Sequence, residues 1–267
     1  MSVLHRLSLA AGVLADREAA DVAAAAVESG FRNVGFTVKP WGDHVTRQLR
    51  STLEPSAVRV LDVEVVRIAP DGSVSDDDRH IVDVGGTLGA ENVLIISNCA
   101  DVAATADALA GLAEQAAGYG MRACLEFMRF TKVPTLASAR EVLRRAAHPA
   151  AGLLIDTLHL ARTGELDEVR EVAGEHLPYA QFCDGLATCG DDDAALIADA
   201  LDDRSPPGDG ELPLSHMLDA LPEGIPLSLE VRSRVLRETY PDPVARATHL
   251  LERTRAFLNQ MERTHDG

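Results

Sequence analysis

The chain has 267 residues, which is enough for one large barrel or for two domains of ordinary size. It carries 42 acidic and 25 basic residues, so its formal net charge is −17. Such a charge repels phosphate backbones and anionic membrane surfaces at long range, which argues against a nucleic-acid or membrane partner. It does not exclude a small anionic substrate, because a few local arginines or a metal ion can reverse the sign inside a pocket.

The cysteines and the N-terminal segment indicate the cellular compartment in which the protein is expected. The four cysteines show no Cys-x-x-Cys spacing, so we expect reduced, mainly structural thiols. The apolar segment from Leu7 to Leu14 follows a weakly basic stretch and precedes an acidic helical segment, which favours a first strand over a signal peptide. No apolar run approaches the roughly 20 residues that span a bilayer. These features predict a soluble, cytoplasmic protein.

Eight short apolar runs recur along the chain. Most successive runs are roughly 25 to 35 residues apart, which is the length of one strand, one helix and two short loops. This interval is the period of a βα unit. The predicted strands cover residues 7–10, 33–37, 58–66, 93–96, 122–126, 153–156, 179–183 and 226–230.

Helical patterns lie between most of these runs, and alternating strands and helices predict a parallel sheet. Eight units without a hairpin signal favour an α/β fold with one closed (β/α)8 TIM barrel, which typically takes about 250 residues. A Rossmann sheet should carry a Gly-rich turn after its first strand, where Gly12 stands alone. The last predicted helix either closes the barrel or forms a dimer face, so a homo-oligomer stays open. The predicted helices cover residues 17–29, 100–118, 136–147, 166–176, 192–201 and 243–262.

One interval is longer than the others and makes an enlarged loop region at about 184–225 within the single domain 1–267. It contains an acidic helix, a Pro/Gly-rich loop that begins at Arg204, and a short helix that ends at Leu221. Extra length at the top of a barrel usually contributes to a substrate pocket or a lid. The acid runs 76–78 and 191–193 are interpreted as a solvated loop and a helix N-terminus.

The segment 152–162 has the pattern of a strand that ends in polar, potentially functional residues. Its apolar run ends abruptly at Asp156, and His159 follows in the predicted loop. Ligands bind at the carboxyl ends of parallel strands, which places Asp156 for chemistry. The alternative interpretation is that Asp156 caps the next turn and His159 packs.

Four late strands end in groups that can bind a metal ion: Glu126, Asp156, Gln181 and Glu230. In a closed barrel their side chains would converge, and unpaired buried charge is costly unless a cation balances it. All four donors are oxygens if the amide presents its carbonyl. Such a set suits one Mg²⁺ or Mn²⁺ ion better than Zn²⁺, although zinc stays an alternative.

These residues lie in strand-end motifs that extend over the later strands. The motifs are Leu125-Glu126-Phe127, Asp156-Thr-Leu-His159, Gln181-Phe-Cys-Asp184 and Leu229-Glu230-Val231, with the loop Gly208-Asp-Gly-Glu-Leu-Pro-Leu214. Together they resemble the xylose-isomerase-like barrels of the sugar phosphate isomerase/epimerase type, and the resemblance covers nearly the whole chain.

The resemblance implies one divalent ion held by Glu126, Asp156, Gln181 and Glu230, with Glu126 and Glu230 also moving protons. The departure is Gln181, where the commoner family pattern has His. A metal that grips the carbonyl oxygen of a ketose acidifies the adjacent C–H, so that a carboxylate can remove the proton.

Further side chains are expected to contact the substrate. The resemblance matches His159 to a family position that touches a substrate oxygen, which sets it aside as a metal ligand, with a packing role as the alternative. Arg204 and Arg232 are candidates to bind a carboxylate or phosphate, with surface salt bridges as the alternative. Trp41 follows a strand end and can form one wall of a sugar pocket.

The first hypothesis is a metal-dependent isomerase or epimerase of a small sugar, sugar phosphate or related polyhydroxy carbonyl compound. The same chemistry serves a dehydratase of an inosose or a dehydroshikimate-like keto compound. An abasic-site endonuclease on this barrel needs a His-rich multi-zinc site and a basic face, which the acidic chain lacks. A barrel that has lost its metal and only binds a ligand is kept open by Gln181.

Overall fold

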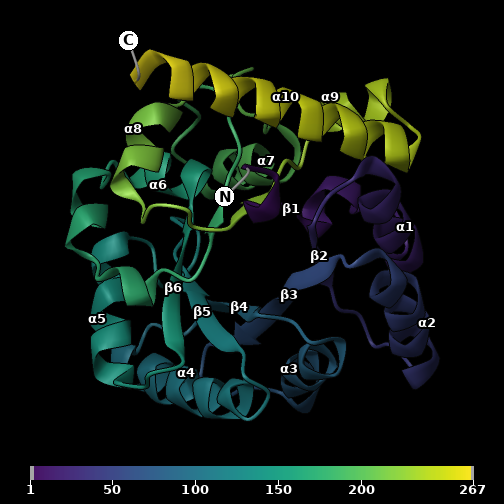
Figure 1. Ribbon diagram of the computed structural model, residues 1–267. Helices are drawn as coiled ribbons and strands as arrows, with labels where there is room; N and C mark the ends of the chain where they lie inside the picture. The colour runs from purple at the N-terminus through teal and green to yellow at the C-terminus, as the bar shows by residue number, and fades with distance from the viewer. Residues whose placement is uncertain (1–2, 266–267) are drawn as a thin grey trace.

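Eight parallel strands form a closed barrel in the computed structural model, which describes residues 3–265 (Figure 1). The strands follow one another in chain order, and β8 pairs with β1 through Leu227 and Leu7. The prediction of a TIM barrel, with all eight strands near their expected positions, is confirmed. The strands are β1 (Leu7–Leu9), β2 (Asn33–Thr37), β3 (Arg59–Ile68), β4 (Asn92–Ser97), β5 (Arg122–Glu126), β6 (Ala151–Asp156), β7 (Ala180–Gln181) and β8 (Leu227–Leu229).

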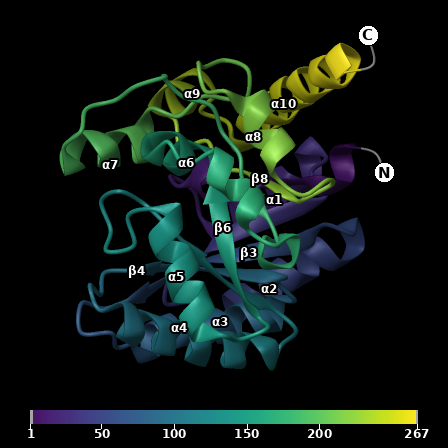
Figure 2. The ribbon, with the colours of Figure 1, turned by 90° about the vertical axis from the view of Figure 1, so that its left-hand side faces the viewer.

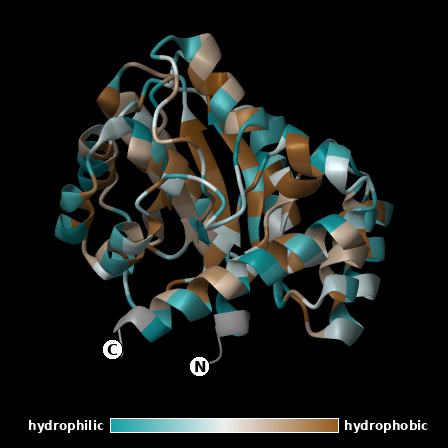
Figure 3. Cartoon of the chain, turned by 90° about the horizontal axis from the view of Figure 1, so that it is seen from above, coloured by the Kyte–Doolittle hydropathy of each residue, from teal (hydrophilic) through white to brown (hydrophobic). Residues whose placement is uncertain are grey.

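Helices surround the strands, and seen from above the apolar strands lie at the centre with mixed helical surfaces around them (Figure 3). The last helix packs against the first and completes this ring. Among residues 3–265 no helix combines the length and the apolar character needed to cross a bilayer. The α-helices are α1 (Ala19–Ser29), α2 (Asp43–Leu53), α3 (Asp76–Leu88), α4 (Val102–Ala117), α5 (Leu136–Ala146), α6 (Thr157–Thr163), α7 (Asp193–Asp202), α8 (Leu214–Ala220), α9 (Arg234–Thr239) and α10 (Pro243–His265).

Several helices differ from the prediction. The expected helix over 166–176 is wrong, because the chain forms two short 3-10 turns there, η4 (Asp167–Glu171) and η5 (Gly174–His176), separated by the extended residue Val172. Helices α2, α3, α6 and α9 were not expected. The acid run 76–78 begins α3, where Ser75 caps the helix and carboxylates favour its N-terminal dipole.

The barrel strands alternate between two apolar environments. Leu125, Leu153 and Ile155 point outward into the large cluster under the helices, whereas Cys124 and Leu154 belong to a separate interior cluster. Because side chains alternate along a strand, Glu126 and Asp156 lie on the interior face with Cys124 and Leu154. The strand ends therefore point these carboxylates into the barrel mouth.

The enlarged loop region is organised by Asp184, which follows β7. Its carboxylate accepts hydrogen bonds from the backbone N–H groups of Gly185, Gly208 and Leu212 at 2.9 to 3.0 Å. Asp184 also forms an isolated backbone bridge with Ser205, the residue after Arg204. These contacts fold the region back over the barrel and bring Arg204 to the mouth. They give a structural role to the predicted glycine-rich loop.

Helix α7 of this region lies beside α6 (Figure 2). The buried pair Arg162 and Asp199, 2.8 Å apart, joins the two helices. Arg162 also donates to the backbone oxygens of Leu186 and Ala187. The helix that covers the mouth is thus fixed to the strand end that carries Asp156.

Candidate functional site

The four predicted metal ligands meet at the mouth of the barrel. Glu126 and Asp156 end β5 and β6, Gln181 ends β7, and Glu230 directly follows β8. The exposed fractions of these residues are between 0% and 5%. Glu126, Gln181 and Glu230 line one cavity and the Gln181 amide contacts Asp156, so the four residues lie at the same end of the barrel.

The Gln181 amide lies against two carboxylates. One end of the amide is 3.0 Å from Asp156 Oδ2 and 3.1 Å from Glu126 Oε1. With its nitrogen turned to them, Gln181 donates to both; with its oxygen turned to them, three oxygens converge. Adjacent ligand atoms of an octahedral ion at 2.0 to 2.1 Å are about 3.0 Å apart. With the amide oxygen turned to the carboxylates, the oxygen–oxygen distances therefore have the spacing of adjacent Mg²⁺ ligands.

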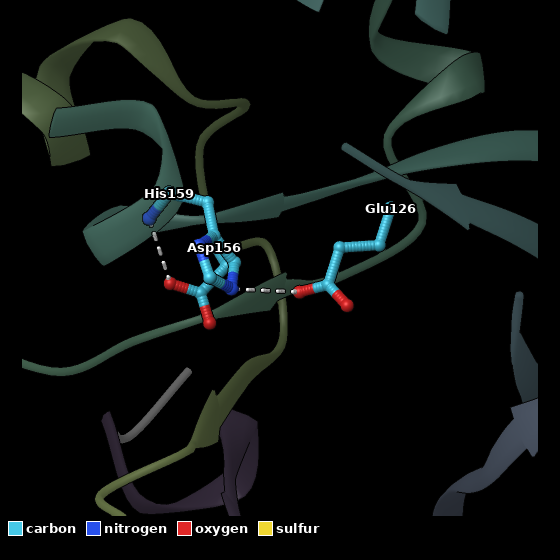
Figure 4. A group of neighbouring side chains, drawn as sticks. All are labelled: Glu126, Asp156 and His159. Atoms are coloured by element: carbon cyan, nitrogen blue, oxygen red, sulfur yellow. Dashed lines mark hydrogen bonds and ion pairs between the residues drawn. The ribbon is translucent and has the colours of Figure 1, made fainter. Parts of the chain in front are cut away.

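His159 is closer to the carboxylates than expected. It lies in the first turn of α6 and not in a loop, and its Nε2 is 4.0 Å from Glu126 Oε1 (Figure 4). Glu126, Asp156 and His159 each offer a ligand atom, and these atoms lie within 4.8 Å of one another. His159, which the sequence argument had set aside as a ligand, belongs to a candidate three-residue metal site.

Asp156 has a capping role as well as a place in the site. Its Oδ1 accepts the backbone N–H groups of Leu158 and His159 at 2.7 and 3.3 Å and so caps α6. Its Oδ2 accepts from Arg204 Nη1 at 2.6 Å. The helix cap and the ion pair fix the carboxylate in one orientation.

Arg204 is buried against this carboxylate, with only 4% of its surface exposed. It also donates from Nε to the backbone oxygen of Ala200 and from Nη1 to that of Glu230. Its Nη2 lies 3.5 Å from His159 Nε2. These contacts commit most of the guanidinium to the protein, so its first role is to hold the site and the expected substrate contact is left to the remaining edge.

Arg232 forms a second, more open pair. Its Nε donates to Glu230 Oε1 at 2.6 Å, and its Nη2 donates to Glu64 Oε1 at 3.1 Å. Glu64 lies within β3 and was not predicted as a site residue. Gly12 makes this packing feasible, because a Cβ there would come within 2.5 Å of Arg232 Nε and would collide with Glu230. The pair thus depends on a residue without a side chain in the loop after β1.

The charges at the mouth do not balance among the described residues. Four buried carboxylates (Glu64, Glu126, Asp156 and Glu230) share the two ion-pairing guanidinium groups of Arg204 and Arg232, while the exposed guanidinium of Arg67 pairs with none of them. Glu230 Oε2 is also buried without a hydrogen-bond partner. One divalent cation would neutralise the two excess negative charges and engage the free oxygen, so the donor set fits such an ion.

The pKa values reflect the same imbalance. Burial, followed by the charge of Asp156, raises the pKa of Glu126 well above its usual range. Burial alone would raise the pKa of Asp156, but Arg204 and His159 hold it below its usual value. Burial lowers the pKa of His159 to about 4, so its imidazole is neutral at neutral pH. A bound cation would favour the ionised form of Glu126.

A cavity of about 220 Å³ opens above these residues. Glu126, His159, Gln181, Arg204, Glu230 and Arg232 line it, together with apolar side chains from β4 and α7. Arg67 of β3 also lines it; this residue is exposed, and its guanidinium donates to the backbone oxygen of Val65 but has no carboxylate partner among the described residues. Alternating Asp62 and Glu64 within an apolar strand were the signal that could have pointed to β3, since both lie on its inner face.

Trp41 lies outside this cavity. It lines an adjoining cavity of about 190 Å³ with Phe36, whose ring it meets edge-on at 6.2 Å, and Arg232 borders both cavities. A larger groove of about 810 Å³ runs between α5 and the η4–η5 segment, away from the strand ends. Its charged side chains Arg140 and Arg144 are paired with Glu171 and Glu141, so the chemistry is assigned to the mouth.

Residues 17–257 match the xylose isomerase-like TIM barrel family, and the chain belongs to this family. A 3-dehydroshikimate dehydratase of Pseudomonas putida is 29% identical over 192 residues. That match covers 65% of this chain and 29% of the relative, so the chain spans less than a third of that protein.

Two solved structures show the same fold. The IolI protein with a bound zinc atom has a TM-score of 0.75 at 15% identity, and the match covers 96% of this chain and 97% of that one. A D-allulose 3-epimerase from Methylomonas sp. has a TM-score of 0.68 at 18% identity, with 96% and 97% covered. At these identities the likeness shows a shared fold.

Proposed function

We propose that the chain is a divalent-metal-dependent enzyme that removes a proton next to a carbonyl group, and more specifically a dehydratase of a small cyclic keto acid of the dehydroshikimate type. One observation carries this choice: unpaired guanidinium donors face the same cavity as the buried oxygen ligands. The Arg67 guanidinium has no acidic partner among the described residues, and Arg232 keeps Nη1 free of hydrogen bonds to them.

The guanidinium groups favour a carboxylate on the substrate. Arginine binds carboxylates through two parallel hydrogen bonds, which fixes both the position and the plane of the bound group. Arg67 and Arg232 reach the cavity from β3 and from the segment after β8. A keto acid held between them would have its ring above Glu126 and His159. The likeness to a curated 3-dehydroshikimate dehydratase supports the same substrate class.

The residues around the cavity can supply the proton transfers. A divalent cation, when bound, polarises a carbonyl oxygen and acidifies the neighbouring C–H. When the four oxygen donors hold the cation, His159 is left neutral and unligated, and a ring nitrogen can accept that proton. In the elimination, the C–H electron pair forms the new double bond, the C–O bond to the β-hydroxyl breaks, and the proton on His159 leaves with the hydroxyl as water. Glu126, 4.0 Å from Nε2, stabilises the imidazolium that forms in between.

A second candidate is the isomerase or epimerase that sequence reasoning ranked first. Glu126 and Glu230 reach the cavity from two different strands, so one can remove a proton and the other can return it. The fold shared with a D-allulose 3-epimerase is consistent with this reaction. A neutral sugar would, however, leave Arg67 without an anionic partner.

A product assay separates the two candidates. Dehydration of a cyclic keto acid creates conjugation that ultraviolet absorbance detects, whereas epimerisation of a ketose only introduces solvent deuterium at the α-carbon. We expect absorbance to rise with 3-dehydroshikimate, to stop on chelation, and to return with Mn²⁺ or Mg²⁺. Deuterium exchange into ketoses without turnover of keto acids would reverse the ranking.

Two variants accompany this assay. Glu230→Gln keeps the side-chain volume but removes a charge and a metal ligand, and it should reduce kcat by about 10²-fold or more. Glu114→Gln, on the exposed face of α4, removes the same charge far from the mouth and should leave kcat unchanged. Activity that persists in the metal-stripped protein would contradict the proposed function.

A further inference from the structure

The cavity beside the metal centre has its own set of recognition groups. It measures about 190 Å³ and lies between the loop after β1, the start of α1 and the segment after β2. Three cationic side chains, Arg17, Lys39 and Arg232, line it, and Glu18 is the one acid among its lining residues. In a chain whose net charge is −17, this local excess of positive charge is unusual and favours an anion.

Two of these cations have free hydrogen-bonding capacity. Lys39 has no ion pair or hydrogen bond to any residue of the described chain, and it is exposed at the cavity. Arg17 donates from Nη2 to the backbone oxygen of Pro241, and its Nε forms an ion pair with Asp16 Oδ2 at 3.4 Å, but its Nη1 has no hydrogen bond to the described residues. The nearest acid, Asp16, is bound through both oxygens by Arg246. An anionic ligand would therefore meet donors that the protein itself leaves unused.

The two cavities are small and share a lining residue, which suggests that they form one site. The metal-side cavity of about 220 Å³ and this side cavity of about 190 Å³ are each smaller than ordinary ligand pockets, which start at roughly 300 Å³. Arg232 borders both, so the two volumes meet at one guanidinium. Together they reach the size of a complete small-molecule site.

We propose that the cavity lined by Arg17, Lys39, Trp41 and Arg232 is a second, anion-binding subsite of the same ligand site, accepting a carboxylate or phosphate group. This inference rests on the proposed function only in placing the carbonyl end of the ligand at the metal centre. The indole of Trp41, held edge-on by Phe36, supplies an apolar wall for the part of the ligand between its two ends. The ligand is thus a small carbonyl compound with an anionic group in the side cavity, remote from its reacting carbon and additional to the carboxylate that Arg67 and Arg232 would hold.

The fluorescence of Trp41 can report ligand binding at this subsite. Trp41 is the one tryptophan of the sequence, so tryptophan fluorescence reports on the side cavity alone. Inorganic phosphate and acetate are titrated separately into the protein as purified with its metal, with chloride holding the ionic strength constant. We expect a saturable fluorescence change, larger for whichever of the two anions the subsite prefers. No saturable change with either anion overturns the proposal.

A matched pair of lysine variants gives the control. Lys39 and Lys132 are the two lysines of the chain, both exposed, and Lys132 lines neither cavity. Lys39→Gln should raise the anion dissociation constant about fivefold, and adding Arg17→Gln should raise it at least tenfold. Lys132→Gln should leave it unchanged. An equal response of Lys39→Gln and the wild type would mean that the anion binds elsewhere, which overturns the proposal.

The outcome is separable from that of the proposed function. If phosphate or acetate binds as expected but no keto acid is turned over, the subsite stands and the proposed reaction falls. If a keto acid is turned over and neither anion changes the fluorescence of Trp41, the reaction stands and the subsite falls.

Discussion

The two sides of the barrel mouth each hold a buried carboxylate against a guanidinium group, yet the two pairs differ in their surroundings. Asp156 and Arg204 have exposed side-chain fractions of 0% and 4%, and neither reaches solvent to a useful extent. Glu230 is equally buried, but the Arg232 side chain is 23% exposed and borders two cavities. The first pair is enclosed except where Arg204 borders the cavity above the ligands, whereas Arg232 of the second pair borders both cavities and is partly exposed.

The difference follows from how many contacts each arginine makes within the protein. Arg204 donates to Asp156 and to the backbone oxygens of Ala200 and Glu230. Arg232 donates to Glu230 and Glu64 and keeps Nη1 free of the described residues. The Arg204 side should therefore set stability, whereas the Arg232 side should set ligand and metal affinity.

The largest expected effect is on the enclosed side. Arg204→Met leaves the Asp156 carboxylate buried without its counter-ion, and breaking such a pair costs about 3 to 5 kcal/mol of unfolding free energy. Arg50→Met, which removes an exposed pair with Glu54 on α2, should cost less than about 0.5 kcal/mol. Urea unfolding of both variants measures the difference. Equal stabilities would mean that the Asp156 pair is not a structural element.

A smaller effect is expected on the open side from Gly12→Ala. The new methyl group collides with Glu230 and lies 2.5 Å from Arg232 Nε, so the pair must move. Overpacking of this kind costs about 1 to 3 kcal/mol, and displacing a ligand's neighbours lowers metal affinity by about 10-fold or more. Calorimetric metal titration measures the affinity.

The matched control for this variant is Gly111→Ala. Gly111 lies within α4, and a Cβ there meets no atom within 4 Å. This substitution should leave metal affinity unchanged and stabilise the helix by about 0.5 to 1 kcal/mol. If Gly12→Ala bound metal as tightly as this control, the packing of Glu230 against Arg232 would not matter for the site.

The smallest effect concerns the metal-free protein. Glu126→Gln removes one of the excess negative charges, and burial already raises the pKa of this carboxyl. We expect the metal-free variant to be more stable than the metal-free wild type by about 0.5 to 2 kcal/mol. Thermal unfolding in the presence of chelator measures it. A destabilised metal-free variant would show that the carboxylates are balanced without a cation.

The barrel could be predicted from the sequence because its strands are short apolar runs with regular spacing. Leu153, Leu154 and Ile155 are fully buried, as their continuous pattern indicates. Helices α2 and α3 were missed because polar residues dominate them and their apolar positions are few. The expected helix at 166–176 fails at Val172, which is extended and is followed within two residues by Gly174.

The site could be predicted where a polar residue ends an apolar run, as at Glu126 and Asp156. Glu64 and Arg67 escaped notice because they lie inside a long strand and carry no end signal. The pairing of Arg204 with Asp156 was also beyond the sequence. It depends on the fold of the enlarged loop region over the barrel, which Asp184 fixes through contacts more than twenty residues away.

The central claim is that Glu126, Asp156, Gln181 and Glu230 form a divalent metal centre, and metal titration of the chelator-treated protein tests it most directly. Mn²⁺ binding followed by calorimetry, with elemental analysis of the purified protein, should give one ion per chain. Affinity should fall as the pH falls, because binding requires ionised carboxylates. Glu126→Gln should lose this binding while Glu114→Gln keeps it. No stoichiometric binding by the wild type, or equal binding by both variants, would contradict the account.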